Sequence, residues 1–177
     1  MTVSISYHIR KLENTDSVNS FKTGDPAFTP LKTFLQKQAK DFQNAHVAQS
    51  YVAVSKENNV LGFITLTCSE VDLRNGYEID DCKRANDYDS LPAVKIARLA
   101  VDSRYRGNQI GETLVSYALG IVIEQIAPVI GCRFIITDAK QSAVNFYCRQ
   151  GFTFLDTDDN REREEPIMFF DLLPCFK

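Results

Sequence analysis

Residues 94–111 constrain the fold more than any other stretch, because a strand-like apolar run stops there at a short Arg/Gly loop that opens directly into a helix. Residues 94–101 are mostly β-branched and aliphatic, which is typical of a buried strand. The loop carries Arg104, Arg106, Gly107 and Gly111. Glycines let a backbone approach a ligand closely, and the first N–H groups of a helix attract anions. The pattern favours an anion-binding turn, with a purely structural strand-to-helix connection as the alternative.

The residues after this loop have helical periodicity. Apolar side chains recur at three- and four-residue steps beyond Glu112, at Leu114, Val115, Ala118, Leu119, Val122, Ile123 and Ile126. One broad apolar face of this kind predicts a helix that packs on the sheet. Further along, residues 131–139 predict a second buried strand, and residues 141–150 predict a short helix that ends at a Gly151 cap.

Residues 106–111 resemble the acetyl-CoA loop of the GNAT N-acetyltransferase superfamily, whose pattern is Arg/Gln-x-x-Gly-x-Gly/Ala at the end of a strand. Arg106 and Gly111 fit the first and last places of that pattern. Gln109 stands where the middle glycine is usual, next to the flexible Gly107.

A stretch further downstream resembles a second block of the same superfamily, and the two blocks have the order and spacing that the superfamily has. It is Ala143-x-x-Phe146-Tyr147-x-x-x-Gly151-Phe152. In this block a tyrosine near the end of a helix faces the thioester, and a Gly-Phe pair leads into the next strand. The two blocks together cover residues 94–154.

The resemblance implies an α/β (α+β) GNAT fold with a central mixed, mostly antiparallel twisted sheet flanked by helices, and acetyl-CoA as cosubstrate at a splayed strand pair. Backbone N–H groups around Leu99, Ala100 and Val101 would bind the pantetheine arm and polarise the thioester carbonyl. The pyrophosphate would lie over Arg106, Gly107, Asn108, Gln109, Ile110, Gly111 and Glu112. Tyr147 would protonate the departing sulfur as general acid, and packing in the core beside Phe146 is its alternative role.

The first half of the chain predicts a helix over residues 30–44, with Pro30 in its first turn, and a hairpin with strands at 51–55 and 60–67. The Phe21-x-x-Gly24 segment, the Leu-rich helix and the 98–102 and 138–140 runs resemble one branch of the superfamily. That branch holds bacterial toxins that acetylate the amino group of aminoacyl-tRNA and are paired with ribbon-helix-helix antitoxins.

Composition sets the remaining bounds. A chain of 177 residues, 44% hydrophobic and 24% charged, suits a single globular domain over residues 1–177. No apolar run reaches the length of a membrane span, so we expect a cytoplasmic protein with no membrane partner. Five scattered cysteines and two distant histidines predict free thiols and no metal site.

Two acidic stretches, residues 72–89 and 156–165, are predicted to be solvated loops. Solubility explains such runs, and the alternative is that they wall the acceptor site and favour a cationic amine or a basic protein. The long 72–89 stretch leaves both explanations open.

Residue types that serve as bases or nucleophiles give weaker signals. Glu70 is the nearest reasonable base, although an exposed charge at a strand end explains it as well. Glu112 suits the positive end of a helix dipole. Cys148, on a mostly apolar helix, is expected to be inert filler, with a nucleophile as the alternative.

The acceptor is an amine whose identity the sequence leaves open. A net charge of −3 and a pI near 5.4 oppose tRNA, although Lys32, Lys37, Lys40, Arg98, Arg104 and Arg106 could form a local basic patch. The leading hypothesis is acetylation of charged tRNA. Alternatives are a polyamine, small-molecule or protein amine, or a non-catalytic module that binds acyl-CoA. A homodimer is also compatible with the sequence.

Overall fold

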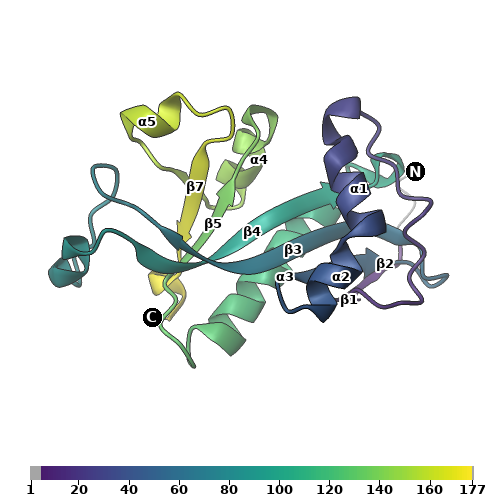
Figure 1. Cartoon of the computed structure of the whole chain (residues 1–177), viewed down its shortest axis with the longest axis horizontal. Coiled ribbons are helices and arrows are strands. Elements are labelled where there is room, and N and C mark those ends of the chain that lie inside the picture. Colours follow the sequence, from purple (N-terminus) through teal and green to yellow (C-terminus); the bar gives the residue numbers. More distant parts are fainter. Residues whose placement is uncertain (1–4, 177) are drawn as a thin grey trace. The chain divides into compact units, whose positions relative to one another are not determined.

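The computed structural model describes residues 5–176. Its strands form a seven-stranded sheet in the order β1-β2-β3-β4-β5-β7-β6. Neighbouring strands are antiparallel in the pairs β1–β2, β2–β3, β5–β7 and β6–β7, and parallel in β4–β5. Helices flank the strands (Figure 1), which confirms the predicted mixed, mostly antiparallel α/β architecture.

The chain divides into two compact units, each made of two separate stretches. The first comprises residues 1–67 and 97–118, and the second comprises residues 68–96 and 119–177. The long strands β3 (Val60–Val71) and β4 (Leu91–Val101) contribute to both units. The single domain over residues 1–177 stays a prediction.

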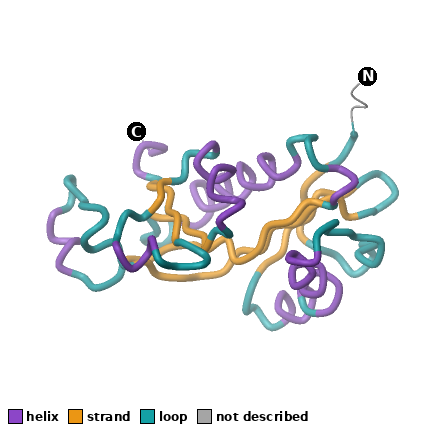
Figure 2. The backbone as a smooth tube through the Cα atoms, turned by 90° about the horizontal axis from the view of Figure 1, so that it is seen from above, coloured by secondary structure: helices purple, strands orange, loops and turns teal. Residues whose placement is uncertain are grey.

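The first unit holds the elements that begin the chain and those that follow β4. They are β1 (His8–Lys11), the 3-10 turn η1 (Pro26–Phe28), α1 (Thr29–Lys37), α2 (Ala39–Asn44), β2 (Gln49–Val54), the 3-10 turn η3 (Ser103–Tyr105) and most of α3 (Ile110–Ile121). Figure 2 shows helices on both sides of the strands in this unit. The predicted hairpin is confirmed by the antiparallel register of β2 and β3.

The predicted helix over residues 30–44 is wrong in one respect, because it is two helices. The first ends at Lys37 and the second begins at Ala39, with Gln38 between them at φ −127°. Pro30 lies in the first turn of α1, as predicted. Apolar periodicity continues across Gln38, so the pattern carries no sign of the break.

Consecutive residues of β3 show how the strands of the first unit are covered on both faces. A Cβ atom added at Gly62 would lie 2.9 Å from Ile110 and 3.1 Å from Leu114, so α3 packs closely on that face. The next side chain, Phe63, points to the other face. There it meets the ring of Phe34 on α1 at 6.5 Å between centroids.

The second unit holds the remaining elements. They are the 3-10 turn η2 (Lys83–Asp87), a π-helical turn η4 (Val122–Ile126) that continues α3, β5 (Phe134–Asp138), the 3-10 turn η5 (Gln141–Ala143), α4 (Val144–Arg149), β6 (Thr153–Phe154), α5 (Asp158–Arg161), β7 (Ile167–Asp171) and the 3-10 turn η6 (Leu173–Phe176). A cluster of buried residues that includes Ile79, Phe134, Ile136 and Phe169 forms its core.

Residues 72–89 and 156–165 are mostly exposed, as predicted, but each stretch contains a short helical turn and a few residues that hold it to the core. Leu73 and Ile79 are buried, and the side chain of Asn86 bonds both the N–H and the carbonyl of Ile79. In the second stretch the buried Asn160, on α5, donates to the Leu155 carbonyl and bonds both backbone groups of Ile167. Both stretches are therefore anchored to the core, although most of their charged side chains are exposed.

Within residues 5–176, no helix is long and apolar enough to cross a membrane. The five cysteines are free, as predicted. No cluster of three or more His, Cys, Asp or Glu in the described part of the chain is arranged to hold a metal ion.

Candidate active site

The loop from β4 to α3 has the backbone that the anion-binding prediction requires. After η3 the chain passes through Gly107 at φ +81° and Gln109 at φ +57°, and α3 begins at Ile110, two residues earlier than its sequence pattern indicated. A Cβ atom added at Gly107 would meet no heavy atom within 4 Å. This stretch of backbone therefore faces open space, where a ligand can approach it closely.

Asp102 organises the start of this loop, a role that sequence reasoning missed. Its carboxylate has no exposed side-chain surface and accepts from the Lys22 N–H at 2.9 Å and the Arg104 N–H at 3.0 Å. The Arg104 guanidinium adds bonds of 2.7 and 3.0 Å. Burial by itself would raise the pKa of the Asp102 carboxyl, but these donors together lower it below its usual value. Arg104 is thus committed to Asp102 and is not a free cation.

Arg106, the predicted phosphate ligand, is exposed and is held by a segment more than eighty residues earlier in the chain. Its guanidinium donates to the Thr23 carbonyl at 2.6 Å and lies 5.8 Å from the ring centroid of Phe28. The Ser103 N–H donates to the Lys22 carbonyl at 2.8 Å, beside this contact. The loop and residues 20–28 therefore form one connected structure.

Gly24 permits this docking. It has φ +78°, and an added Cβ atom would lie only 2.8 Å from the Cβ atom of Ser103. Any side chain there would clash with Ser103, so glycine is required at this position for residues 20–28 to dock on the loop.

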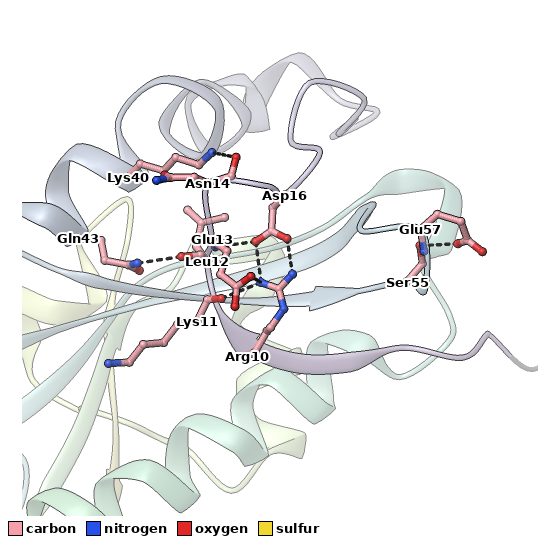
Figure 3. Close-up of polar contacts among 10 residues, drawn as sticks. All are labelled: Arg10, Lys11, Leu12, Glu13, Asn14, Asp16, Lys40, Gln43, Ser55 and Glu57. Carbon is pink, nitrogen blue, oxygen red and sulfur yellow. Dashed lines mark hydrogen bonds and ion pairs between the residues drawn. The ribbon is translucent and has the colours of Figure 1, made fainter.

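The connection between β1 and α1, which leads to this segment, is itself fixed by polar contacts (Figure 3). The Arg10 guanidinium donates to the fully buried Asp16 carboxylate at 2.6 and 2.9 Å. The Gln43 amide donates to the Leu12 carbonyl at 2.9 Å, and the Lys40 ammonium donates to the Asn14 carbonyl at 3.1 Å. Arg10 and Lys40 are therefore engaged within the fold.

The other predicted coenzyme residues of this unit lie on β4 and in the first turn of α3. Leu99, Ala100 and Val101 are half-buried at the end of β4, Asn108 is half-buried, Ile110 and Gly111 are buried, and Glu112 is half-buried. Thr113, exposed one residue further on, donates its hydroxyl to the Gln109 carbonyl at 2.8 Å and accepts from the Tyr7 hydroxyl at 3.1 Å. These contacts fix the start of the helix whose N–H groups would face the pyrophosphate.

Replacing Gln109 with glycine is expected to preserve or improve the affinity for acetyl-CoA. Gln109 already has the left-handed conformation that glycine adopts without strain, so the substitution keeps the loop and removes a cost of about 1 kcal/mol. Calorimetric titration with acetyl-CoA measures the effect. A clear loss of affinity would show instead that the Gln109 side chain contacts the coenzyme.

Tyr147, the predicted general acid, belongs to the second unit. It lies near the end of α4 and is 5% exposed, with its ring 5.1 Å from Phe146 and 5.3 Å from Phe152 between centroids. The helix ends as predicted, because Gly151 has φ +87°, and the Gly151 and Phe152 N–H groups donate to the Cys148 and Tyr147 carbonyls. Burial raises the pKa of Tyr147 to about 12, against a smaller opposing effect of its hydrogen bond with Thr137. The phenol therefore keeps its proton throughout the neutral range.

The weaker candidates are both exposed. Glu70 lies within β3 and accepts from the Ser90 hydroxyl at 2.8 Å, as a surface charge would. Cys148 is exposed, so it does not fill the core as predicted, whereas its inertness stays a prediction. The helix pattern placed it next to Phe146 and Tyr147, but α4 turns that position to solvent.

Comparison with known proteins gives a consistent result. The model of the acetyltransferase (GNAT) family matches residues 12–152. A tRNA-acetylating toxin of Mycobacterium tuberculosis (strain ATCC 25618 / H37Rv) is 29% identical over 150 residues, which cover 84% of this chain and 86% of the toxin.

Solved structures with the same fold include two of AtaT. AtaT complexed with acetyl-methionyl-tRNAfMet is 23% identical with a TM-score of 0.81, over 97% of this chain and 98% of that chain. A Tyr-to-Phe mutant of the AtaT toxin, bound to the C-terminus of the antitoxin AtaR and acetyl-CoA, is 23% identical with a TM-score of 0.74, over 97% and 99% of the two chains.

Proposed function

The chain belongs to the acetyltransferase (GNAT) family, and from that membership we propose that it transfers the acetyl group of acetyl-CoA to the amino group of aminoacyl-tRNA. The observation that carries the choice of acceptor is the similarity to a tRNA-acetylating toxin over 84% of this chain. In the same proposal, Arg106, Gly107 and the first turn of α3 hold the coenzyme pyrophosphate.

The distribution of charge removes the main objection to tRNA. The first unit carries ten Lys and Arg against seven Asp and Glu, a net charge of +3, whereas the second carries ten against sixteen, a net charge of −6. The acidic pI of the whole chain is therefore a property of the second unit. A basic first unit, which contains the loop from β4 to α3, is compatible with a phosphate-rich acceptor.

The chemistry needs few groups. Acetyl-CoA, when bound, supplies a thioester carbonyl that a neutral amine attacks, so that a C–N bond forms as the C–S bond breaks. The backbone N–H groups around Leu99, Ala100 and Val101 would donate to the carbonyl oxygen as negative charge develops there. The amine loses one proton, and the departing sulfur gains one.

Tyr147 would supply the proton to the sulfur and recover one from the amine. Complete transfer from a phenol of pKa about 12 to a thiolate of pKa about 8.5 is uphill by about 5 kcal/mol. Proton donation must therefore be concerted with loss of the amine proton. Otherwise the phenol keeps its proton and makes only a strong hydrogen bond to the developing thiolate. Either way, the hydroxyl acts only in the transition state.

One protein partner and a cellular location follow from the same proposal. We expect an antitoxin of the ribbon-helix-helix type, since a toxin of this fold is bound to the C-terminus of the antitoxin AtaR. We also expect the protein to act in the cytoplasm, where charged tRNA and acetyl-CoA occur together.

Expressed alone in a bacterium, the wild type is expected to arrest growth, and the Tyr147→Phe variant at equal abundance is not. Charged tRNA from arrested cells should carry acetyl groups on the amino acid, detected by mass spectrometry of the nucleotide end released by nuclease. A harmless wild type without acetylated aminoacyl-tRNA would overturn the proposal. Thiol release from acetyl-CoA in the presence of polyamines or peptides would then identify the other class of acceptor.

A further inference from the structure

The first unit contains a cavity of about 560 Å³ against α1, within the size range of small-molecule sites. Its walls are mainly the residues at the start of α1, among them Pro30, Leu31 and Phe34. Arg98 of β4 is the one charged side chain among the residues that line it. The cavity is therefore largely apolar, with a single guanidinium.

Arg98 differs from the other arginines of this unit. Its guanidinium carbon lies over the ring of Phe34, 3.7 Å from the ring centroid, and Phe34 itself is 2% exposed. Among residues 5–176, no carboxylate or other acceptor is bonded to Arg98. Arg10, Arg104 and Arg106 are all bonded to acceptors within the protein.

An unbonded guanidinium at a half-buried position has five N–H donors available. Burial lowers the pKa of Arg98, yet the group stays charged at any physiological pH. Among residues 5–176, no fully buried side-chain nitrogen lacks a hydrogen-bond partner, so the N–H groups of Arg98 reach solvent, where an anionic ligand can take the place of water.

The strand places this cavity next to the proposed coenzyme site. Arg98 directly precedes Leu99, whose backbone is proposed to bind the pantetheine arm. Side chains alternate along β4, and Ala100 packs on the same cluster as Phe34, so Arg98 and Ala100 face α1. A ligand in the cavity would lie on the α1 face of the strand that holds the acetyl group.

We propose that this cavity receives the 3′-terminal nucleotide of the acceptor, with Arg98, held over the ring of Phe34, binding its phosphate and supporting its base. The inference rests on the proposed acetylation of charged tRNA and adds the residues that would recognise its end. Guanidinium groups bind phosphate through paired N–H donors and stack on bases. A polyamine would instead meet like charge at Arg98.

Adenosine 5′-monophosphate is the direct probe, because it reproduces the terminal nucleotide with its phosphate. It would be titrated by calorimetry into protein saturated with CoA, so that the coenzyme site is closed to it. Arg98→Leu is expected to weaken its binding ten- to a hundred-fold, the value of a charge-assisted hydrogen bond or two, while Arg98→Lys keeps part of it. Adenosine, without phosphate, should bind wild type and Arg98→Leu equally.

The matched control is Arg84→Leu, which removes one exposed arginine from η2 and should leave nucleotide binding unchanged. Circular dichroism and CoA affinity establish that each variant is folded. If Arg98→Leu is unstable, Arg98→Lys and the comparison of AMP with adenosine in the wild type decide the question. The inference is overturned if AMP does not bind, or if its affinity is the same in wild type, Arg98→Leu and Arg98→Lys.

Kinetics separate this inference from the proposed function. Arg98→Leu should raise KM for charged tRNA at least tenfold with little change in acetyl-CoA affinity. If charged tRNA is acetylated equally well by wild type and Arg98→Leu, the cavity assignment is wrong and the proposed function stands. If no charged tRNA is acetylated but AMP binds through Arg98, the proposed function fails and the nucleotide site stands.

Discussion

Replacing Tyr147 with phenylalanine is expected to lower turnover ten- to ten-thousand-fold, the range typical of removing a general acid. The substitution keeps the ring that packs between Phe146 and Phe152 and deletes only the hydroxyl. Coenzyme affinity and fold should therefore be nearly unchanged. Single-turnover release of CoA, measured beside calorimetric affinity for acetyl-CoA, separates the two properties.

Tyr88→Phe is the matched control, because the same atom is removed from a tyrosine that is 67% exposed. It should be fully active. Full activity of Tyr147→Phe would instead assign Tyr147 to core packing, the alternative that its aromatic surroundings also support.

The raised pKa of Tyr147 makes the stability of the fold depend on pH, which tests the burial of its hydroxyl independently of activity. Its ordinary pKa near 10 applies to the unfolded chain, and the folded value is about 12, so the protonated phenol stabilises the fold fully below pH 10 and progressively less up to pH 12. On the order of 2–3 kcal/mol of stability should be lost in that window. Denaturant unfolding at pH 9 and pH 11.5 should show a smaller loss for Tyr147→Phe than for wild type.

Local sequence patterns predicted most elements of the fold. The hairpin, the helix after the Arg/Gly loop and the Gly151 cap depend on periodicity and turn chemistry within a few residues, and all are confirmed. The break at Gln38 was not predictable in this way, because a one-residue interruption leaves the apolar face of α1 and α2 in phase.

Long-range polar contacts were outside the reach of the sequence. The loop was identified by Arg106 and its glycines, yet the bonds that hold it come from Lys22 and Thr23, some eighty residues away. The commitment of Arg104 to Asp102 was equally hidden, since an arginine near an aspartate predicts no particular pair. The net charge was uninformative for a related reason: a value for the whole chain conceals a basic and an acidic unit.

Arg106→Glu is expected to weaken acetyl-CoA binding about a hundred- to a thousand-fold. Loss of a charge-assisted bond to phosphate costs about 1.5–3 kcal/mol, and the new carboxylate adds repulsion against the pyrophosphate. Calorimetric titration at low and high salt measures this. Because Arg106 is exposed, salt screens its charge, so the difference in acetyl-CoA affinity between variant and wild type should become smaller as salt rises.

Arg106 also donates to the Thr23 carbonyl, so a loss of acetyl-CoA affinity could come from a displaced loop and not from a lost phosphate contact. A second substitution separates these two causes. Arg106→Gln keeps a donor for that carbonyl without the charge, so it should preserve the docking of residues 20–28 while losing most of the phosphate interaction. Arg84→Glu, the same charge reversal at an exposed arginine of η2, controls for the change in net charge. Acetyl-CoA affinity that is lost in Arg106→Glu but kept in Arg106→Gln would contradict the phosphate contact. Arg106 would then only anchor the loop to Thr23. In that case the N–H groups of Gly107 and the first turn of α3 must hold the phosphate alone.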